Sequence, residues 1–231
     1  MIPVYPENKI GRDFIIGDLH GQVHLLREKM AEKRFDVGCD RLFATGDLVD
    51  RGKDSEGAVE LLNEPWFFSV MGNHDDCAIQ FATGQIKDPG WYAGIGGAWM
   101  IGHTRDERLG YAIMLQTLPI ALEIEIGGGR RVGVVHADCP FDDWEKFRQS
   151  QVPNGSRSIL EEAAIRNTAL WSRGRREAMR DDDVSGIHAV IVGHTPVERV
   201  TSLGNVFYVD TGCGKSNGRL SMKRIKKLVG A

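Results

Sequence analysis

The stretch Gly46-Asp47-Leu48-Val49-Asp50-Arg51-Gly52 follows the apolar run Leu42-Phe43-Ala44. The run predicts a buried strand, and the two glycines predict a sharp turn at its end. Two carboxylates and a guanidinium are therefore expected on one loop at the carboxyl end of a strand, where open α/β sheets bind ligands. Such a loop suits a divalent metal ion beside a phosphate, because carboxylates bind the metal and arginine binds phosphate oxygens. For this heptad alone, a salt bridge within the loop is an equal alternative.

Two more predicted strands end in polar clusters of the same kind. Residues 14–16 run into Gly17-Asp18-Leu19-His20-Gly21, and residues 67–71 run into Gly72-Asn73-His74-Asp75. The acid and the imidazole of the first cluster are two residues apart on extended backbone. They point the same way, so both can reach one metal ion.

Helices are predicted over residues 22–33 and 55–62, after the first two of these strands. Strand, turn and helix therefore alternate, which predicts a parallel sheet with right-handed crossovers. All three polar clusters then share one edge of that sheet. We interpret His24, in the first helix, as a structural residue rather than a ligand.

The second half of the chain adds two histidines at strand ends. A predicted strand over residues 131–135 ends in His136, and another over residues 189–192 ends in Gly193-His194. Residues 122–126 alternate apolar and acidic side chains, as a strand with one exposed face does, and predict a hairpin with 131–135. Further strands are predicted at residues 206–209 and 220–225.

Two long segments are predicted to be helical or irregular and to lie over the active-site edge of a single domain spanning residues 1–231. They are residues 76–118 and residues 141–180. We interpret the aromatic side chains of the first as packing residues rather than substrate contacts. His103 receives no role, and Gly94-Ile95-Gly96-Gly97 lacks the spacing of a dinucleotide-binding loop.

Composition narrows the class of protein. The net charge of −3 gives no reason to expect nucleic-acid or membrane binding. The chain starts without the basic flank and apolar block of a signal peptide. The four scattered cysteines form no Cys-x-x-Cys pair, which fits a reducing cytoplasm, so the sequon Asn154-Gly155-Ser156 is set aside.

Six side chains at strand ends form a mixed oxygen and nitrogen donor set. They are Asp18, His20, Asp47, Asn73, His136 and His194. The set is too large for one structural zinc, but it suits two metal ions about 3.5–4 Å apart that share a carboxylate. Asp47, between the first and third clusters, is the expected bridge.

In this order, five motifs resemble the metallophosphoesterase signature of the PPP phosphatases: Gly17-Asp18-x-His20-Gly21, Gly46-Asp47-x-Val49-Asp50-Arg51-Gly52, Gly72-Asn73-His74, His136 and Gly193-His194-Thr195. The run from His136 to Asp143 is similar to the bacterial and phage branch of that family. The resemblance implies an αββα sandwich, in which two mixed sheets flanked by helices replace one parallel sheet. It also implies a Ser/Thr protein phosphatase, with some activity toward phosphotyrosine, that acts on phosphoproteins.

The resemblance implies a role for each motif residue. One metal ion would be bound by Asp18, His20 and Asp47, and the other by Asp47, Asn73, His136 and His194. Arg51 and Arg173 would hold the substrate phosphate together with Asn73 and His74. His74 would be the general acid, oriented by Asp50. The metals are expected to be manganese, with iron, zinc, cobalt or nickel as alternatives.

This chemistry needs no side-chain nucleophile. Two cations lower the pKa of a bridging water and neutralise phosphoryl oxygens during in-line attack. The alkoxide of phosphoserine is a poor leaving group, which gives a protonated His74 a clear task. Family members usually carry Glu at the position of Asp75, and eukaryotic members carry Gly at that of Ala137; neither position is an expected metal ligand, so these departures bear on the substrate and not on the reaction.

Other interpretations stay open or fail on particular residues. A diadenosine tetraphosphate hydrolase shares these metal motifs, and a non-catalytic binding module of the same fold is a remote alternative. The spacing from Cys213 to Arg219 matches the Cys-x5-Arg loop of thiol phosphatases, but Gly212 stands where those loops carry His. A P-loop at Gly214-Lys215-Ser216 fails because Val209 replaces its first glycine.

Overall fold

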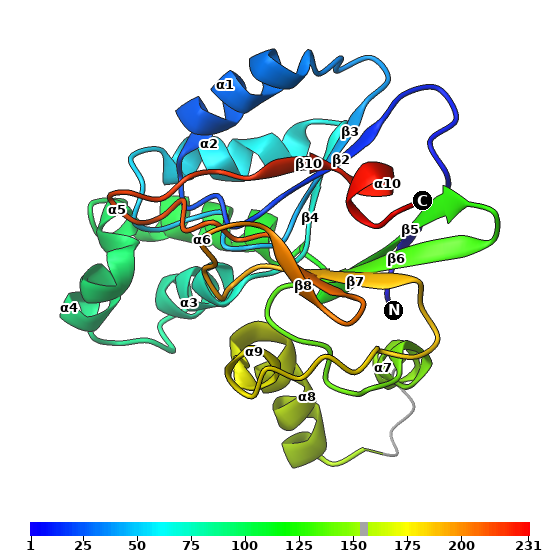
Figure 1. The fold of residues 1–231 in the computed structure, drawn as a ribbon. Helices are drawn as coiled ribbons and strands as arrows, with labels where there is room; N and C mark the ends of the chain where they lie inside the picture. The colour runs from blue at the N-terminus through cyan, green and yellow to red at the C-terminus, as the bar shows by residue number, and fades with distance from the viewer. Residues whose placement is uncertain (153–156) are drawn as a thin grey trace.

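The computed structural model describes residues 1–152 and 157–231. The sequon Asn154-Gly155-Ser156 lies outside the described residues. Two β-sheets pack face to face, with α1 and α2 over one outer face and α7, α8 and α9 over the other (Figure 1). The expected αββα sandwich is confirmed.

The four-stranded sheet has the order β10-β2-β3-β4. Strands β2 to β4 are parallel neighbours, and β10 pairs antiparallel with β2 as an edge strand. Its strands are β2 (Asp13–Ile16), β3 (Arg41–Ala44), β4 (Phe67–Ser69) and β10 (Met222–Arg224). The helices that follow them are α1 (Val23–Lys33), α2 (Ser55–Glu60) with a 3-10 turn (Leu61–Asn63), α3 (Asn73–Ala82) and α10 (Ile225–Leu228).

The six-stranded sheet has the order β1-β5-β6-β7-β9-β8. Strands β5 and β6 form the predicted antiparallel hairpin, and β6, β7 and β9 are parallel. Its strands are β1 (Val4–Tyr5), β5 (Ala121–Gly127), β6 (Arg130–Val135), β7 (Ala189–Val192), β8 (Thr201–Leu203) and β9 (Val206–Tyr208). The helices on its outer face are α7 (Trp144–Ser150), α8 (Ile159–Trp171) and α9 (Gly174–Glu177).

Residues 76–118 contain several short helices, as the sequence predicts. These are α4 (Pro89–Tyr92), a π-helical turn (Ala93–Gly97), α5 (Ala98–Ile101) and α6 (Arg105–Leu115). The stretch from Pro89 to Ile101, which we call the cap segment, lies at one end of the sandwich (Figure 1). Backbone N–H of Arg51 donates to the carbonyl of Gly96 across 2.9 Å, so the cap segment contacts the loop after β3.

One prediction about the hairpin is wrong. The alternation in residues 122–126 predicts exposed acids, and Glu125 is exposed, but Glu123 is completely buried. Helix α7 covers that face of β5, and Trp144 donates its indole N–H to Glu123 across 2.9 Å. The guanidinium of Arg131 also pairs with Glu123, so the buried carboxylate is satisfied.

The two sheets are joined by an apolar layer. Phe43 of β3 is completely buried there, and its ring centroid lies 5.2 Å from that of Phe68 and 5.3 Å from that of Tyr5. Apolar side chains of β6 and β7 belong to the same cluster. This layer fixes the position of one sheet against the other. Within the described residues, every helix is too short or too polar to span a bilayer.

We expect Phe43→Ala to lower the free energy of unfolding by about 3–5 kcal/mol, because it leaves a cavity between the sheets. Ile113→Ala is the control, since Ile113 is 65% exposed and its loss should change stability by less than about 0.5 kcal/mol. Urea unfolding of both variants measures the difference. Equal, small losses in the two would mean that Phe43 does not join the sheets.

Candidate active site

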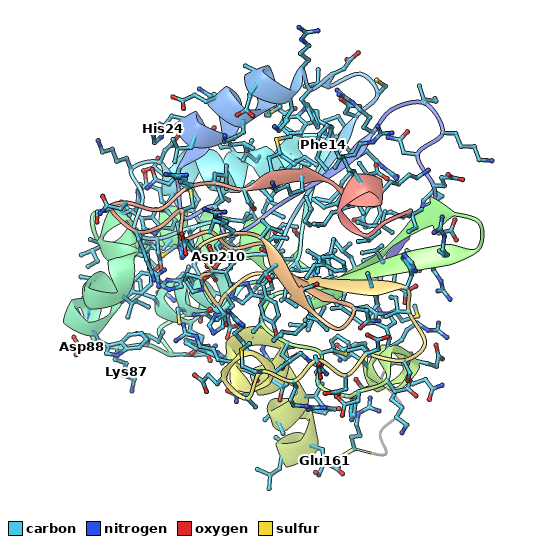
Figure 2. All side chains as sticks on the ribbon, viewed as in Figure 1. Phe14, His24, Lys87, Asp88, Glu161 and Asp210 are labelled. Atoms are coloured by element: carbon cyan, nitrogen blue, oxygen red, sulfur yellow. The ribbon has the colours of Figure 1, made fainter. Side chains whose placement is uncertain are left out.

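All ten predicted site residues gather around one cleft of about 610 Å³ at the carboxyl ends of the strands. Six of them line the cleft directly: Asp47, Arg51, Asn73, His74, Arg173 and His194. Asp18, His20, Asp50 and His136 lie just behind them and are connected by hydrogen bonds or close contacts. His24 is exposed on α1, in the upper part of Figure 2, whereas Asp210, whose carboxylate neighbours those of Asp18 and Asp47, is central. His24 therefore lies outside the cluster.

Asp47 occupies the centre of the cluster. One carboxylate oxygen accepts the backbone N–H of His74 across 2.8 Å and lies 3.5 Å from Nε2 of His136. The other oxygen lies 3.6 Å from Nε2 of His20. Asp47 therefore contacts both halves of the predicted donor set, as a bridging ligand must.

Asn73 faces two imidazoles at once. Its side-chain oxygen lies 2.9 Å from Nε2 of His136 and 2.9 Å from Nδ1 of His194. The second nitrogen of each ring faces a backbone carbonyl, that of Thr45 at 2.7 Å and that of Trp171 at 3.2 Å. A carbonyl only accepts, so these second nitrogens carry the protons.

The donor set therefore fits a cation. With their protons committed to carbonyls, His136 and His194 turn lone pairs toward the oxygen of Asn73, and Asp47 lies next to them. Lone pairs facing one another need a positive charge between them. Neutral imidazole, amide oxygen and carboxylate are ligands that divalent transition metals accept.

His20 has the same orientation on the other side of Asp47. Its Nδ1 lies 3.0 Å from the carbonyl of Val49, which leaves the lone pair on Nε2. That lone pair faces Nη1 of Arg51 at 2.8 Å, a cationic donor. His20, Asp47 and His74 bring ligand atoms within metal-binding reach of one another.

The surroundings keep the ligand imidazoles neutral and Asp47 charged, for different reasons. Burial lowers the pKa of His20 to about 4, that of His194 to about 3, and the pKa of His136 below its usual value. Burial opposes ionisation of Asp47, but the imidazoles of His136, His74 and His20 outweigh it, so its pKa lies below the usual range. Neutral histidine and ionised carboxylate are the protonation states that bind metals.

Asp18 is buried behind this cluster. Its carboxylate accepts the backbone N–H of His194 across 3.1 Å and the hydroxyl of Thr45 across 3.2 Å. Burial and the neighbouring carboxylates of Asp210 and Asp47 raise the pKa of Asp18 well above its usual value. Three acids so close together are stable in ionised form only beside cations.

His74 and Asp50 form a pair. Nδ1 of His74 lies 2.7 Å from a carboxylate oxygen of Asp50, and Nε2 faces Nη2 of Arg51 at 2.7 Å. Burial lowers the pKa of His74, but the carboxylates of Asp47 and Asp50 outweigh it and the pKa lies above its usual value. The other oxygen of Asp50 accepts from Tyr92 and Trp99 of the cap segment.

Two arginine side chains, from different parts of the fold, line the cleft. Arg51 follows β3, and Arg173 lies between α8 and α9. Both side chains are exposed to solvent. The other residues that line the cleft include Trp91, Ile95, Trp171 and Lys215.

The backbone is strained where the site residues lie. Among the described residues, seven non-glycine residues have positive φ, and five of these belong to the candidate site: His20, Asp47, Asp50, Arg51 and His194. Such conformations cost about 1–3 kcal/mol each and persist only where the surrounding structure imposes them. Gly72 makes this possible beside Asp47, because a Cβ there would overlap the backbone nitrogen of Asp47.

Several residues of the site have no clear signal in the sequence. Thr45 supports both Asp18 and His136, while Tyr92 and Trp99 hold Asp50 from more than forty positions away. Asp75 accepts the backbone N–H groups of Leu48 and Gly72 and so ties the loop after β3 to the loop after β4. Only Asp75 could be suspected from sequence, as an acid in the first turn of a helix.

The thiol alternative disagrees with the structure. Cys213 is only 2% exposed, its sulfur faces the carbonyl of Leu19, and burial raises the pKa of the thiol to about 12. A nucleophilic cysteine needs an exposed thiolate. His103 also lies apart from the cluster and pairs with Glu56.

Comparison with known proteins agrees with this geometry. A family model described as calcineurin-like phosphoesterase matches residues 14–218. The chain is 32% identical over 219 residues to serine/threonine-protein phosphatase 2 of Salmonella typhimurium, covering 92% of both proteins. It is 36% identical over 76 residues to a symmetrical bis(5'-nucleosyl)-tetraphosphatase of Dechloromonas aromatica, covering 32% of this chain and 28% of that protein. The crystal structure of a cold-active protein tyrosine phosphatase matches with a TM-score of 0.64 at 18% identity, covering 98% of this chain and 77% of that one, which is evidence for the fold alone.

Fold and donor set together define a metallophosphoesterase. The chain belongs to the calcineurin-like metallophosphoesterase family, and the family resemblance expected from the motifs is confirmed.

We expect Gly214→Ala to weaken the binding of divalent metal by about tenfold. Losing a group that orients a metal ligand typically costs about 10- to 100-fold in affinity, so this is the lower end of that range. A Cβ at Gly214 would overlap the ring of His20 and crowd the side chain of Arg51. Titration calorimetry with Mn²⁺ measures the affinity. Gly110→Ala is the control, because a Cβ there meets nothing within 4 Å. Unchanged affinity in Gly214→Ala would contradict the role of His20.

Proposed function

We propose that the chain is a metal-dependent phosphomonoesterase that hydrolyses phosphoserine and phosphothreonine in proteins, with some activity toward phosphotyrosine. One observation carries the proposal: lone pairs of Asn73, His136 and His194 converge beside the carboxylate of Asp47 in a cleft that also holds two arginines. The likeness to bacterial serine/threonine phosphatases over most of the chain supports the substrate class.

Two divalent ions would be held by this chain, with Mn²⁺ as the proposed metal. Asp18, His20 and Asp47 would bind one ion. Asp47, Asn73, His136 and His194 would bind the other. When bound, such ions activate water and neutralise charge on the phosphoryl group.

Arg51 and Arg173 would bind the phosphoryl oxygens. A guanidinium donates two parallel hydrogen bonds to an anionic oxygen pair, so each arginine both attracts and orients the phosphate. Both line the same cleft. Arg51 also donates to Nε2 of His74, so a phosphate that draws Arg51 toward itself would free that nitrogen for a proton.

His74 would protonate the leaving oxygen. Asp50 holds Nδ1, which directs Nε2 into the cleft and stabilises the charged imidazolium. A serine alkoxide is a strong base and leaves slowly unless it is protonated. The raised pKa of His74 favours the protonated form that this step needs.

Hydrolysis of diadenosine tetraphosphate is the second candidate. The local similarity to symmetrical bis(5'-nucleosyl)-tetraphosphatases favours it, but that similarity covers only 32% of this chain. Both functions would use the same candidate metal ligands, so only the substrate distinguishes them. A non-catalytic module is disfavoured because every ligand and the acid are present.

We expect Mn²⁺-reconstituted protein to release phosphate from a phosphoserine peptide while diadenosine tetraphosphate in the same tube stays intact. Exhaustive chelation should abolish release, and added Mn²⁺ should restore it, because the donor set cannot polarise a phosphate without cations. Phosphate assay and chromatography follow the two substrates.

Activity that survives complete metal removal would contradict the proposed mechanism. Cleavage of the dinucleotide with the peptide untouched would establish the second candidate instead.

We expect His74→Asn to slow phenyl phosphate by about 100-fold or more and 4-nitrophenyl phosphate far less, because nitrophenolate leaves without protonation. The ratio of the two kcat values measures the effect. His103→Asn is the control, since His103 lies outside the cleft and should leave both rates unchanged. Equal losses on the two esters would remove His74 from the acid role.

A further inference from the structure

The carboxylate of Asp50 has three side-chain donors and no exposure to solvent. One oxygen lies 2.7 Å from Nδ1 of His74. The other accepts two hydrogen bonds, from the hydroxyl of Tyr92 at 3.0 Å and from the indole N–H of Trp99 at 2.8 Å. The loop after β3 and the cap segment therefore meet at a single oxygen atom of Asp50.

The two aromatic donors supplement the single basic partner of the buried Asp50 carboxylate. Among the described residues, His74 is the one basic side chain within salt-bridge distance of Asp50. A buried carboxylate without enough donors is costly, so the neutral donors on one oxygen carry much of its stabilisation. Because they saturate that oxygen, the second oxygen is left to the imidazole, and the plane of the carboxylate is fixed.

The donors are themselves held in place. Tyr92 is completely buried and stacks on Phe81 with ring centroids 4.5 Å apart. Trp99 contacts the ring of Tyr111 edge to face, with centroids 5.2 Å apart. The absence of a side chain at Gly97 makes room for the ring of Tyr92, because a Cβ there would overlap it.

A second contact ties the same segment to the turn. Backbone N–H of Arg51 donates to the carbonyl of Gly96, and a Cβ at Gly96 would overlap the backbone of Arg51. The cap segment thus forms hydrogen bonds with both Asp50 and Arg51, which have φ values of 71° and 66°. Strained residues of this kind keep their conformation only under such constraint.

We propose that Tyr92 and Trp99 are positioning residues for the general acid, acting through Asp50 to aim Nε2 of His74 at the leaving oxygen. This inference rests on the proposed role of His74. Both aromatic side chains act on the oxygen of Asp50 that faces away from the imidazole, and Asp50 is not one of the proposed metal ligands. Neither side chain therefore contributes to metal binding. The proton that reaches the leaving group still comes from His74.

The test compares kcat for phenyl phosphate and 4-nitrophenyl phosphate in the Mn²⁺-loaded protein. Tyr92→Phe keeps the ring and its stacking but removes the hydroxyl donor, and Trp99→Phe removes the indole donor. Each should lower kcat on phenyl phosphate by about tenfold, the value of one hydrogen bond to a charged group, with less than about a twofold change on the nitrophenyl ester. KM and Mn²⁺ affinity should stay within about twofold.

A matched control and a double mutant separate positioning from folding. Tyr111→Phe changes a tyrosine that packs on Trp99 without bonding Asp50, so its kcat ratio should equal that of the unmodified chain. Once His74 is replaced by Asn, adding Tyr92→Phe should cause no further loss, because the residue through which Tyr92 acts is gone. Thermal unfolding of every variant checks that the fold is intact.

Equal losses on both esters, or the same loss with and without His74, would overturn the inference while leaving the proposed function in place. A leaving-group effect in His74→Asn with none in Tyr92→Phe or Trp99→Phe would do the same. If the unmodified protein hydrolyses neither ester in any metal form, the proposed function fails and the inference fails with it.

Discussion

A carboxylate buried among neutral imidazoles is the constraint on which the rest of this structure depends. Asp47 is 2% exposed, and one of its oxygens accepts a backbone N–H while both lie near histidine nitrogens. Burying a charge is costly unless opposite charge lies beside it. Since the surrounding rings direct lone pairs, not protons, into the same space, the arrangement calls for cations from outside the chain. The positive φ of Asp47 and the absence of a side chain at Gly72 allow the backbone to hold the Asp47 carboxylate among these rings.

The sandwich supplies the site by joining two sheets that each hold part of it. Asp47 and Asn73 come from the four-stranded sheet, whereas His136 and His194 follow strands of the six-stranded sheet. Nδ1 of His136 donates to the carbonyl of Thr45 across the interface between the sheets, so the packing of one sheet on the other sets the direction of a ligand. The apolar layer around Phe43 and the cluster of candidate ligands are therefore parts of one interface, and the stability of the fold and the geometry of the site are coupled.

Sequence predicted what depends on neighbours in the chain. Polar residues placed directly after apolar runs located the strand ends, and every candidate ligand proved to lie in one cluster. It could not predict what depends on distant partners. The alternation predicts an exposed Glu123, but Trp144 covers that side chain. The same limit applies to the donors to Asp50: the sequence predicts Tyr92 and Trp99 as packing residues, and nothing in their local sequence indicates a carboxylate partner. Both side chains pack against other aromatic rings and also donate a hydrogen bond to Asp50.

The most direct test of the central claim is anomalous diffraction from crystals of the protein grown with Mn²⁺. The account predicts two anomalous peaks about 3.5–4 Å apart, one on each side of the Asp47 carboxylate, with His20 toward one and His136 and His194 toward the other. A single peak that does not touch Asp47, or peaks only at exposed acidic groups, would contradict it.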